Sequence, residues 1–453
     1  MHQHPVTRRQ FIGRSSLALA GSFLLPRALR SQPAAPSRNS LLNLGIIGLG
    51  RMASSHIGAF ANDARCRITA VCDVDDERLA YEKKNIAEKY RQAYGEKTDV
   101  ATHKDFRALL ADPSIDAVVI ATPDHWHALM SILAARAGKA IYCEKPMTFT
   151  VAEGRRVVDA ARNAGVVFQT GSQQRSEASF RRAVQLARSG KLGEIKEVWC
   201  RFGRQYPVDF NWPAEPLPPG MDWDMWVGPA VMRPYTSHFL PRLIGGNPPK
   251  PYGYPWGEWR WHIEYGNGYQ ADWGAHHLDI ALWGLGLDGK GPRYIEVYPS
   301  QNPDAPADTK HIRYTFANGT KLHYGMPDRI KREAGGADMV AFIGSEGTAS
   351  CARGGRFWAS TPALRNVRFG DESSPVLVSN DHRRNFIDAV LFGRPVICPP
   401  EIGQSSCNMC LVGNIAHLLG RDLEWDWRAR KFKGDEAANR YLWRKNRGEW
   451  ANI

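Results

Sequence analysis

Short apolar runs alternate with segments of helical pattern through the first third of the chain. Fully apolar runs bounded by turn residues are typical of strands buried on both faces of a parallel sheet. Strands that alternate with helices predict right-handed crossovers and a doubly wound parallel sheet, which we place at residues 41–170. The predicted strands are Leu42–Ile47, Cys66–Val71, Ala117–Ala121, Ala140–Cys143 and Val166–Gln169, and the predicted helices include Lys104–Leu110, Leu129–Ala137 and Val151–Asn163.

From about Lys196 the pattern changes to short alternating or apolar runs, and Asn318-Gly319 predicts a hairpin turn. Antiparallel strands with one covered face predict an α+β domain at residues 171–380 with a large open, mainly antiparallel sheet. The segment 381–453 is predicted to be helical, above all up to Leu419, and to pack back on both domains. The strands predicted for the second sheet are Lys196–Phe202, Arg293–Tyr298, Thr309–Phe316, Lys321–Tyr324 and Met339–Gly344.

A stretch rich in Pro, Trp and Tyr, residues 205–269, interrupts the second domain. Its aromatic content argues against disorder, and a long loop inside a compact domain is usually functional. Two interpretations carry equal weight: the rings line a carbohydrate-binding cleft, or they fill a gap between domains or subunits. The tryptophans concerned are Trp212, Trp223, Trp226, Trp256, Trp259 and Trp261.

The first strand ends in a glycine motif, Gly48-Leu49-Gly50-Arg51-Met52-Ala53, which precedes a helix. Gly48 allows a tight turn, Gly50 lets the backbone approach a pyrophosphate, and Ala53 keeps the helix close to the strand. The helix N-terminus offers N–H groups to the phosphates. The second strand ends in Asp73, whose carboxylate can accept both ribose hydroxyls of NAD and would repel the extra phosphate of NADP. The motif therefore predicts a Rossmann domain that binds NAD rather than NADP.

Polar residues also follow two later strands, where ligands of doubly wound sheets bind. Thr122 and Pro123 follow one strand, and Glu144 and Lys145 follow another. The Lys145 ammonium could hydrogen-bond a substrate oxygen near the nicotinamide, although from its position alone it could equally be a surface lysine in a turn. The segment Gln173–Arg175 is a further candidate for the lining of the site.

The stretch from Asp272 to Trp283 is predicted to form one helix, with Asp272 and His276 one turn apart on the same face. Histidine is well suited to accept a hydroxyl proton near neutral pH. Two structural alternatives stay open: Asp272 as a helix N-cap, and His276 as a core histidine bonded to backbone. His277 points about 100° away and is a weaker candidate.

Four passages in this order resemble the Gfo/Idh/MocA oxidoreductase family: Gly48–Ala53, Ala121–His127, Cys143–Pro146 and Asp272–Asp279. The resemblance covers residues 42–290, and Asp381–Phe386 is similar to exported members. It implies an NAD(P)-dependent oxidoreductase acting on a sugar or polyol, and a homo-oligomer, dimer or tetramer. By resemblance the catalytic residues are Lys145, Asp272 and His276, and the cofactor-binding residues are Gly48, Gly50, Arg51, Met52, Ala53, Asp73, Thr122, Pro123, Glu144 and Lys145.

Composition narrows the possible partners. The chain has 453 residues and a formal net charge of +13, but its basic residues are scattered and no nucleic-acid recognition motif appears, so we expect no nucleic-acid partner. Beyond the N-terminal segment we expect no membrane-spanning run. Most of the eight cysteines are isolated, and Cys407 and Cys410 have CxxC spacing without a second pair, so we identify no metal site.

The first forty residues predict an export signal. Thr7–Ile12 resembles the twin-arginine signal, the mildly apolar stretch Ser15–Leu25 is too short to span a bilayer, and a Pro-, Ala- and Ser-containing linker follows. We therefore expect a periplasmic or other extracytoplasmic location. Because no free NAD pool exists there, the cofactor should stay bound through the catalytic cycle.

These features predict oxidation of a sugar, polyol or glycoside hydroxyl, with His276 as base, Asp272 orienting His276 or a neighbouring hydroxyl, and Lys145 stabilising the alkoxide. A first alternative is a redox-neutral glycosidase or lyase with tightly bound NAD. The Tyr-Pro-Thr-His-Gly-Leu-Gly-Pro stretch of the family's N-acetylgalactosaminidases is missing from this chain, which weakens that particular activity. A second alternative is a sugar-binding protein without catalysis.

Overall fold

The computed structural model describes residues 41–201, 207–240, 256–299, 310–370 and 372–452. The predicted export signal at 1–40 lies outside these residues, as does part of the aromatic stretch. Within them, no helix is both long and apolar enough to cross a membrane.

The N-terminal half of the fold is a six-stranded parallel sheet in the order β3-β2-β1-β4-β5-β6. The doubly wound sheet is therefore confirmed, and the fully apolar strand β4 is buried along its whole length. The short strand β3 was not predicted, because two of its three residues are exposed and carry no apolar pattern. The strands are β1 (Leu42–Ile47), β2 (Cys66–Cys72), β3 (Ala101–His103), β4 (Ala117–Ile120), β5 (Ala140–Glu144) and β6 (Phe168–Gly171).

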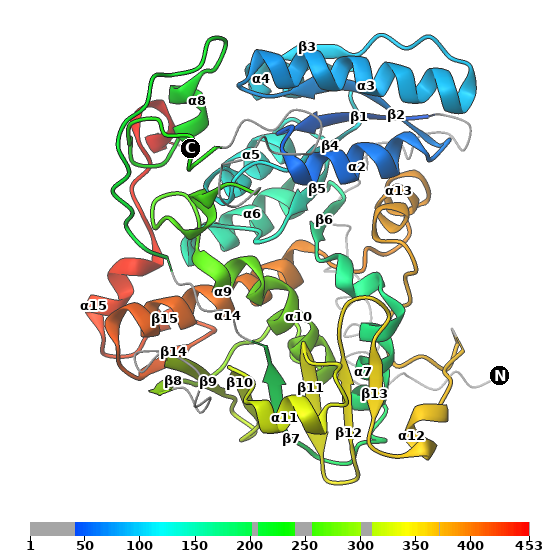
Figure 1. Ribbon diagram of the computed structural model, residues 1–453, viewed down its shortest axis with the longest axis vertical. Helices are drawn as coiled ribbons and strands as arrows, with labels where there is room; N and C mark the ends of the chain where they lie inside the picture. Colours follow the sequence, from blue (N-terminus) through cyan, green and yellow to red (C-terminus); the bar gives the residue numbers. More distant parts are fainter. Residues whose placement is uncertain (1–40, 202–206, 241–255, 300–309, 371, 453) are drawn as a thin grey trace, which may run out of the picture.

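Helices cover both faces of this sheet. Local sequence sets their ends: the side chain of Asp75 caps α3, and Thr150 with Glu153 forms a capping box on α6. On one face α2 and α3 share a core with α13, which comes from near the end of the chain and lies beside α2 in Figure 1. The helices are α2 (Arg51–Ala61), α3 (Asp76–Tyr94), α4 (Phe106–Ala111), α5 (Asp124–Arg136), α6 (Val151–Ala164) and α13 (His382–Phe392).

The second sheet has nine strands in the order β13-β12-β11-β7-β10-β9-β8-β14-β15. All neighbours are antiparallel except β7 and β10, so the mainly antiparallel sheet is confirmed. The strands are β7 (Ile195–Cys200), β8 (Tyr294–Pro299), β9 (Lys310–Thr315), β10 (Lys321–Tyr324), β11 (Val340–Gly344), β12 (Thr348–Cys351), β13 (Phe357–Ala359), β14 (Leu423–Asp426) and β15 (Lys431–Phe432).

Three helices pack on the second sheet and form its core with it: α7 (Ala178–Arg188), α10 (Gly274–Leu285) and α14 (Pro400–Leu419). Figure 1 shows α10, α14 and the short α9 (Gly268–Asp272) between the two sheets. Shorter helices are α8 (Trp223–Val227), α11 (Asp328–Glu333), α12 (Pro362–Asn366) and α15 (Glu436–Asn439), with 3-10 turns η1 (Gln173–Ser176), η2 (Glu258–Trp261), η3 (Arg440–Leu442) and η4 (Gly448–Asn452).

Two predicted helical stretches need correction. The segment 381–453 is not helical throughout, because Leu423 and Trp425 bury alternate side chains and β14 extends the second sheet at its edge. The predicted helix from Asp272 to Trp283 is two helices, α9 and α10, which meet at Trp273. Close packing accompanies this junction: a Cβ at Gly274 would lie 3.1 Å from the Tyr324 hydroxyl.

Candidate functional site

A cavity of about 580 Å³ lies where the carboxyl ends of the parallel strands face α9 and α10. It is lined by every predicted site residue except Ala53, which lies in the first turn of α2 and is fully buried, as expected for close helix–strand packing. The sequence motifs thus come together in one cleft.

The glycine loop fits a dinucleotide. Gly48 has φ +86°, and a Cβ there would lie 2.9 Å from the backbone of Ala121, so only glycine makes this turn without strain. Gly50 begins α2 without a side-chain cap, and the first turn carries no acidic residue. The N–H groups of this turn are therefore free of local acceptors and can bind the phosphates.

Asp73 holds the loop at the end of β2. Its two carboxylate oxygens accept the backbone N–H groups of Leu49, at 2.7 Å, and of Asp75, at 3.1 Å. These bonds fix the carboxylate beside the cavity, where a ribose would lie, and leave lone pairs for its hydroxyls.

Lys145 and Asp272 form an ion pair across the two halves of the fold. The Lys145 ammonium lies 2.6 Å from the carboxylate and 3.0 Å from the backbone carbonyl of Asp272, and each side chain is only 16% exposed. Burial alone would raise the pKa of Asp272, but the charges of Lys145 and Arg260 outweigh it and lower this pKa. Asp272 is thus an ionised partner that fixes Lys145 at the end of β5.

His276 lies in the first turn of α10 and faces the same cavity. Burial, followed by the charges of Lys145 and Arg353, lowers the pKa of this histidine well below its usual value. Among the described residues, the Nδ1 atom of His276 is buried without a hydrogen-bond partner. The alternative interpretation, a core histidine bonded to the backbone, therefore finds no support at this atom. The ring is neutral and able to accept a proton.

The expected orientation of His276 by Asp272 is not seen. Within the described part of the chain no hydrogen bond joins these two side chains, and the Asp272 carboxylate is engaged by Lys145 instead. The break at Trp273 explains the difference, since the two residues do not share one continuous helix.

The other histidines of the motifs have structural positions. The ring nitrogens of His127 lie 2.7 Å and 2.9 Å from the carbonyl oxygens of Pro146 and Thr122, so this side chain connects the loops after β5 and β4. His277 contacts the carbonyl oxygen of Arg201 at 3.0 Å, away from the cavity. The position of His277 agrees with the weaker role expected for it.

Glu144 belongs to a buried network that the sequence did not reveal. Arg383 of α13 donates to His56 Nδ1 at 2.9 Å, so the opposite nitrogen, Nε2, carries hydrogen and donates to Glu144 at 2.8 Å. Burial would raise the pKa of Glu144, but the bond from His56, the charge of Lys145 and the bond from Gln173 lower it to about 2. No motif pointed to His56, and for Arg383 the only signal was the resemblance of its segment to exported proteins.

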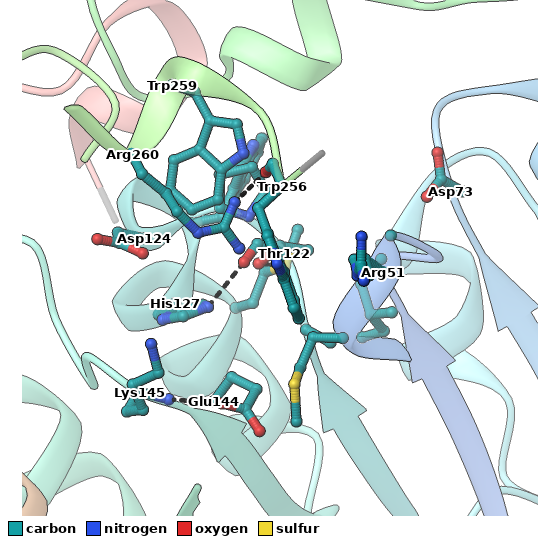
Figure 2. A pocket seen from close by; sticks show the side chains of 18 of the residues that line it. Arg51, Asp73, Thr122, Asp124, His127, Glu144, Lys145, Trp256, Trp259 and Arg260 are labelled. Carbon is teal, nitrogen blue, oxygen red and sulfur yellow. Dashed lines mark hydrogen bonds between the residues drawn. The ribbon is translucent and has the colours of Figure 1, made fainter. Parts of the chain in front are cut away.

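Asp124 and Arg260 are two further residues of the cavity wall that sequence reasoning did not assign (Figure 2). Burial raises the pKa of Asp124 to about 7 against the opposing charges of Lys145 and Arg260. Arg260 lies 3.8 Å from the Asp272 carboxylate. The site therefore gathers two cations and two carboxyl groups around one small volume.

The segment after β6 divides between the site and the core. Gln173 lines the cavity, whereas Gln174 and Arg175 are buried elsewhere. Arg175 binds Asp279 through two hydrogen bonds of 2.7 and 2.8 Å and Asp288 through another of 2.7 Å. It therefore connects this segment to α10 rather than to a ligand.

The aromatic stretch contributes both to a buried cluster and to the wall of the cavity. Trp223 and Trp226 stack at 4.4 Å within a buried cluster, and the Trp226 carbonyl accepts a hydrogen bond from Trp126 on α5. Trp226 also lines the cavity, together with Trp256, Trp259 and Arg260. Figure 2 shows Trp256 and Trp259 over the same side of the cavity.

Two findings concern metals and cysteines. Among the described residues no three His, Cys, Asp or Glu side chains are placed to hold a metal ion. The eight cysteines are unpaired and buried, so Cys407 and Cys410 form no disulfide here.

Two family models together match most of the chain. The Gfo/Idh/MocA model described as an oxidoreductase family with an NAD-binding Rossmann fold matches residues 42–172, and that described as the oxidoreductase family's C-terminal alpha/beta domain matches residues 199–452. The parallel sheet is therefore an NAD-binding Rossmann domain.

Individual relatives are more distant. Myo-inositol 2-dehydrogenase of Thermotoga maritima is 28% identical over 37% of this chain and 48% of its own length. Levoglucosan dehydrogenase of Pseudarthrobacter phenanthrenivorans is 31% identical over 38% of this chain and 43% of its own. These matches thus span less than half of the curated relatives. An aldose–aldose oxidoreductase structure from Caulobacter crescentus, complexed with glycerol, has a TM-score of 0.52 and 20% identity, and covers 85% of this chain and 99% of its own.

Proposed function

We propose that this chain, which belongs to the Gfo/Idh/MocA oxidoreductase family, oxidises a hydroxyl group of a sugar, polyol or glycoside with NAD. The observation that carries the proposal is the convergence of the Lys145–Asp272 ion pair and the neutral His276 on the cavity that also contains the glycine loop and Asp73. The names of the inositol and levoglucosan dehydrogenases support a polyol or sugar as substrate.

Each residue then has a defined task. Bound NAD supplies the acceptor for the hydride that leaves the carbinol carbon. His276 takes the hydroxyl proton and becomes an imidazolium as the C–O bond gains double-bond character. The Lys145 ammonium donates a hydrogen bond to the same oxygen while negative charge develops on it, and Asp272 keeps the ammonium in place. The low pKa of His276 keeps its ring in the accepting form.

Replacement of the base tests the proposal. We expect His276→Ala to slow formation of reduced nicotinamide by roughly 10²- to 10⁴-fold in single-turnover absorbance experiments, the usual contribution of a general base. Suitable probes are myo-inositol, levoglucosan and glucose. The adjacent His277→Gln is the matched control, because that ring contacts the Arg201 carbonyl oxygen outside the cavity. Undiminished hydride transfer in His276→Ala would remove this residue from the role.

The twin-arginine-like segment Thr7–Ile12 favours a second candidate function. An exported enzyme without access to free NAD would act most simply by oxidising and re-reducing one substrate, with net cleavage of a glycoside. Screening glycosides and free sugars separates the two functions. A steady reduced-nicotinamide signal indicates a dehydrogenase, and cleavage without that signal indicates the redox-neutral enzyme.

A further inference from the structure

One side of the cavity is built from residues that the proposed reaction does not use. We call it the arginine side and define it by Gln173, Glu177, Trp273, Arg353 and Arg383, which all line the cavity. They come from η1, the N-cap of α7, the α9–α10 junction, the β12–β13 hairpin and α13. A surface assembled from so many separate elements is well suited to surround one end of a substrate.

Arg353 is held by an aromatic ring rather than by an acid. Its guanidinium lies 4.5 Å from the centre of the Trp273 ring. Within the described residues, its side chain makes no hydrogen bond and has no carboxylate within 4.0 Å. Arg356 in the same hairpin differs, since it donates to the Gly336 carbonyl at 2.7 Å and lies 3.6 Å from Asp338. The donors of Arg353 are therefore available in the cavity.

Arg383 is the second arginine whose charge is not neutralised locally. Its donors meet the neutral acceptors His56 Nδ1, at 2.9 Å, and Ser55 Oγ, at 2.8 Å. In the described part of the chain no carboxylate lies within 4.0 Å of it, whereas its neighbour Arg384 lies 3.8 Å from Asp63. The arginine side thus presents two cations without ion-pair partners.

This surface adjoins the reacting end of the cavity. The Trp273 ring lies beside the His276 ring, with 6.3 Å between their centres. The charge of Arg353 is also one of the causes that lower the pKa of His276. A group bound by Arg353 can therefore belong to the same small molecule whose hydroxyl meets His276.

Glu177 is the acidic member of the arginine side. Burial raises its pKa, and the nearby charge of Arg353 opposes that rise. It forms no ion pair with Arg353 within 4.0 Å among the described contacts, so it leaves the guanidinium free. Glu177 and Gln173 are suited to hydrogen-bond sugar hydroxyls next to a charged substituent.

We propose that the substrate is an acidic sugar whose carboxylate binds to Arg353, while Arg383 adds a second positive charge to the cavity wall. The proposal rests on the proposed oxidation and names its substrate class. The planar guanidinium matches a carboxylate through two parallel hydrogen bonds, and its contact with the Trp273 ring holds the guanidinium at the cavity before the substrate binds.

The test compares hexuronates with their neutral counterparts. Glucuronate and galacturonate would be assayed against glucose and galactose in the NAD-loaded protein. We expect a higher kcat/KM for at least one hexuronate than for its neutral counterpart. In Arg353→Gln the kcat/KM for that hexuronate should fall roughly 10- to 100-fold, mainly because KM rises, as expected for the loss of a charge-assisted hydrogen bond. The neutral sugars should change little, and Arg353→Lys should recover part of the loss.

A matched control and a binding measurement complete the design. Arg356→Gln controls for Arg353→Gln, because Arg356 is close in sequence but lies outside the cavity. Calorimetric titration of the hexuronates into the protein loaded with reduced cofactor measures affinity without turnover. Equal use of acidic and neutral sugars, or an Arg353→Gln loss no larger than that of Arg356→Gln, overturns the acidic-sugar proposal and leaves the oxidation proposal standing. Arginine-dependent binding of a hexuronate without any oxidation would instead contradict the proposed function alone.

Discussion

Burial and neighbouring charge together set the protonation state of His276. Burial and the nearby charges of Lys145 and Arg353 all act in one direction, against the imidazolium. A proton acceptor that is protonated only at low pH works over a wide pH range.

This state predicts the acid side of the pH profile. Because the pKa of His276 is lowered from 6.5, its accepting form persists as the pH falls below 6.5, and the acid limb of kcat/KM should lie below that value. Removal of one positive charge in Arg353→Gln should move the limb to higher pH. The measurement is kcat/KM against pH for both proteins, with Arg356→Gln as control. A limb at or above pH 6.5 in the unmodified protein would contradict this view.

At the scale of residues, the sequence allowed prediction of those site members that are tied to a local motif. Gly48, Asp73 and Lys145 each follow a strand, so their place at the cleft follows from the topology of a doubly wound sheet. Arg353 and Arg383 reach the cleft from distant elements, and only tertiary packing determines that. The pairing of Lys145 with Asp272 was also not foreseen, although both residues were.

At the scale of elements, α10 is held against the Rossmann half by a buried charge network. Arg175 follows β6, Asp279 lies on α10, and Ser406 on α14 donates to Asp279 at 2.6 Å. Both Arg175 and Asp279 have side chains that are 1% exposed. The network therefore fixes the helix that presents His276.

Replacement of one residue of this charge network should lower the free energy of unfolding substantially. We expect Arg175→Met to destabilise the protein by about 3–5 kcal/mol, because it leaves the buried carboxylate of Asp279 without its partner. Arg162→Ala is the control, since its pair with Glu401 is exposed and should be worth about 1 kcal/mol or less. The midpoints of urea unfolding measure both. A shift for Arg175→Met as small as that of the control would show that the network contributes little.

Elements with a clear hydrophobic pattern could be predicted from the sequence. Short strands that form only by pairing at the edge of a sheet could not. The apolar runs of β1 and β4 identify buried strands directly. The strands β14 and β15 are short, and they form because an open edge of the second sheet is available to pair with them. The α9–α10 break at Trp273 is followed directly by Gly274, where a Cβ would lie 3.1 Å from the Tyr324 hydroxyl. A single glycine in a helical pattern does not by itself predict a break, so the junction was missed.

At the scale of the whole molecule, the cleft exists because two sheets face each other through α9, α10 and α14. The Rossmann half contributes the cofactor loop and Lys145, and the second half contributes Asp272, His276 and Arg353. Either half alone would lack part of the site. Export through the twin-arginine route and assembly into a homo-oligomer remain proposals at this scale, and both are compatible with a cofactor bound inside a folded protein.

The histidines as a group predict how the whole molecule responds to acid. Burial lowers the pKa of seven of them to about 3 or 4, namely His125, His262, His277, His311, His323, His382 and His417. Between pH 6.5 and about 4 the unfolded chain binds protons at these sites while the folded protein does not, so the free energy of unfolding falls as the pH falls.

Asp124, whose pKa is raised to about 7, acts in the opposite direction, as do Asp73, Glu82, Glu177 and Asp279, whose pKa values burial also raises. Among the described residues these carboxyl groups are fewer than the histidines whose pKa is lowered. We therefore expect the melting temperature to fall steadily from pH 7 to pH 5 at constant ionic strength, before the carboxylates of ion pairs such as Glu144 become protonated. Differential scanning fluorimetry measures this directly, and His125→Asn should flatten the slope by removing one of the titrating rings. A melting temperature that is constant or rises over this interval would mean that these histidines can be protonated within the folded protein.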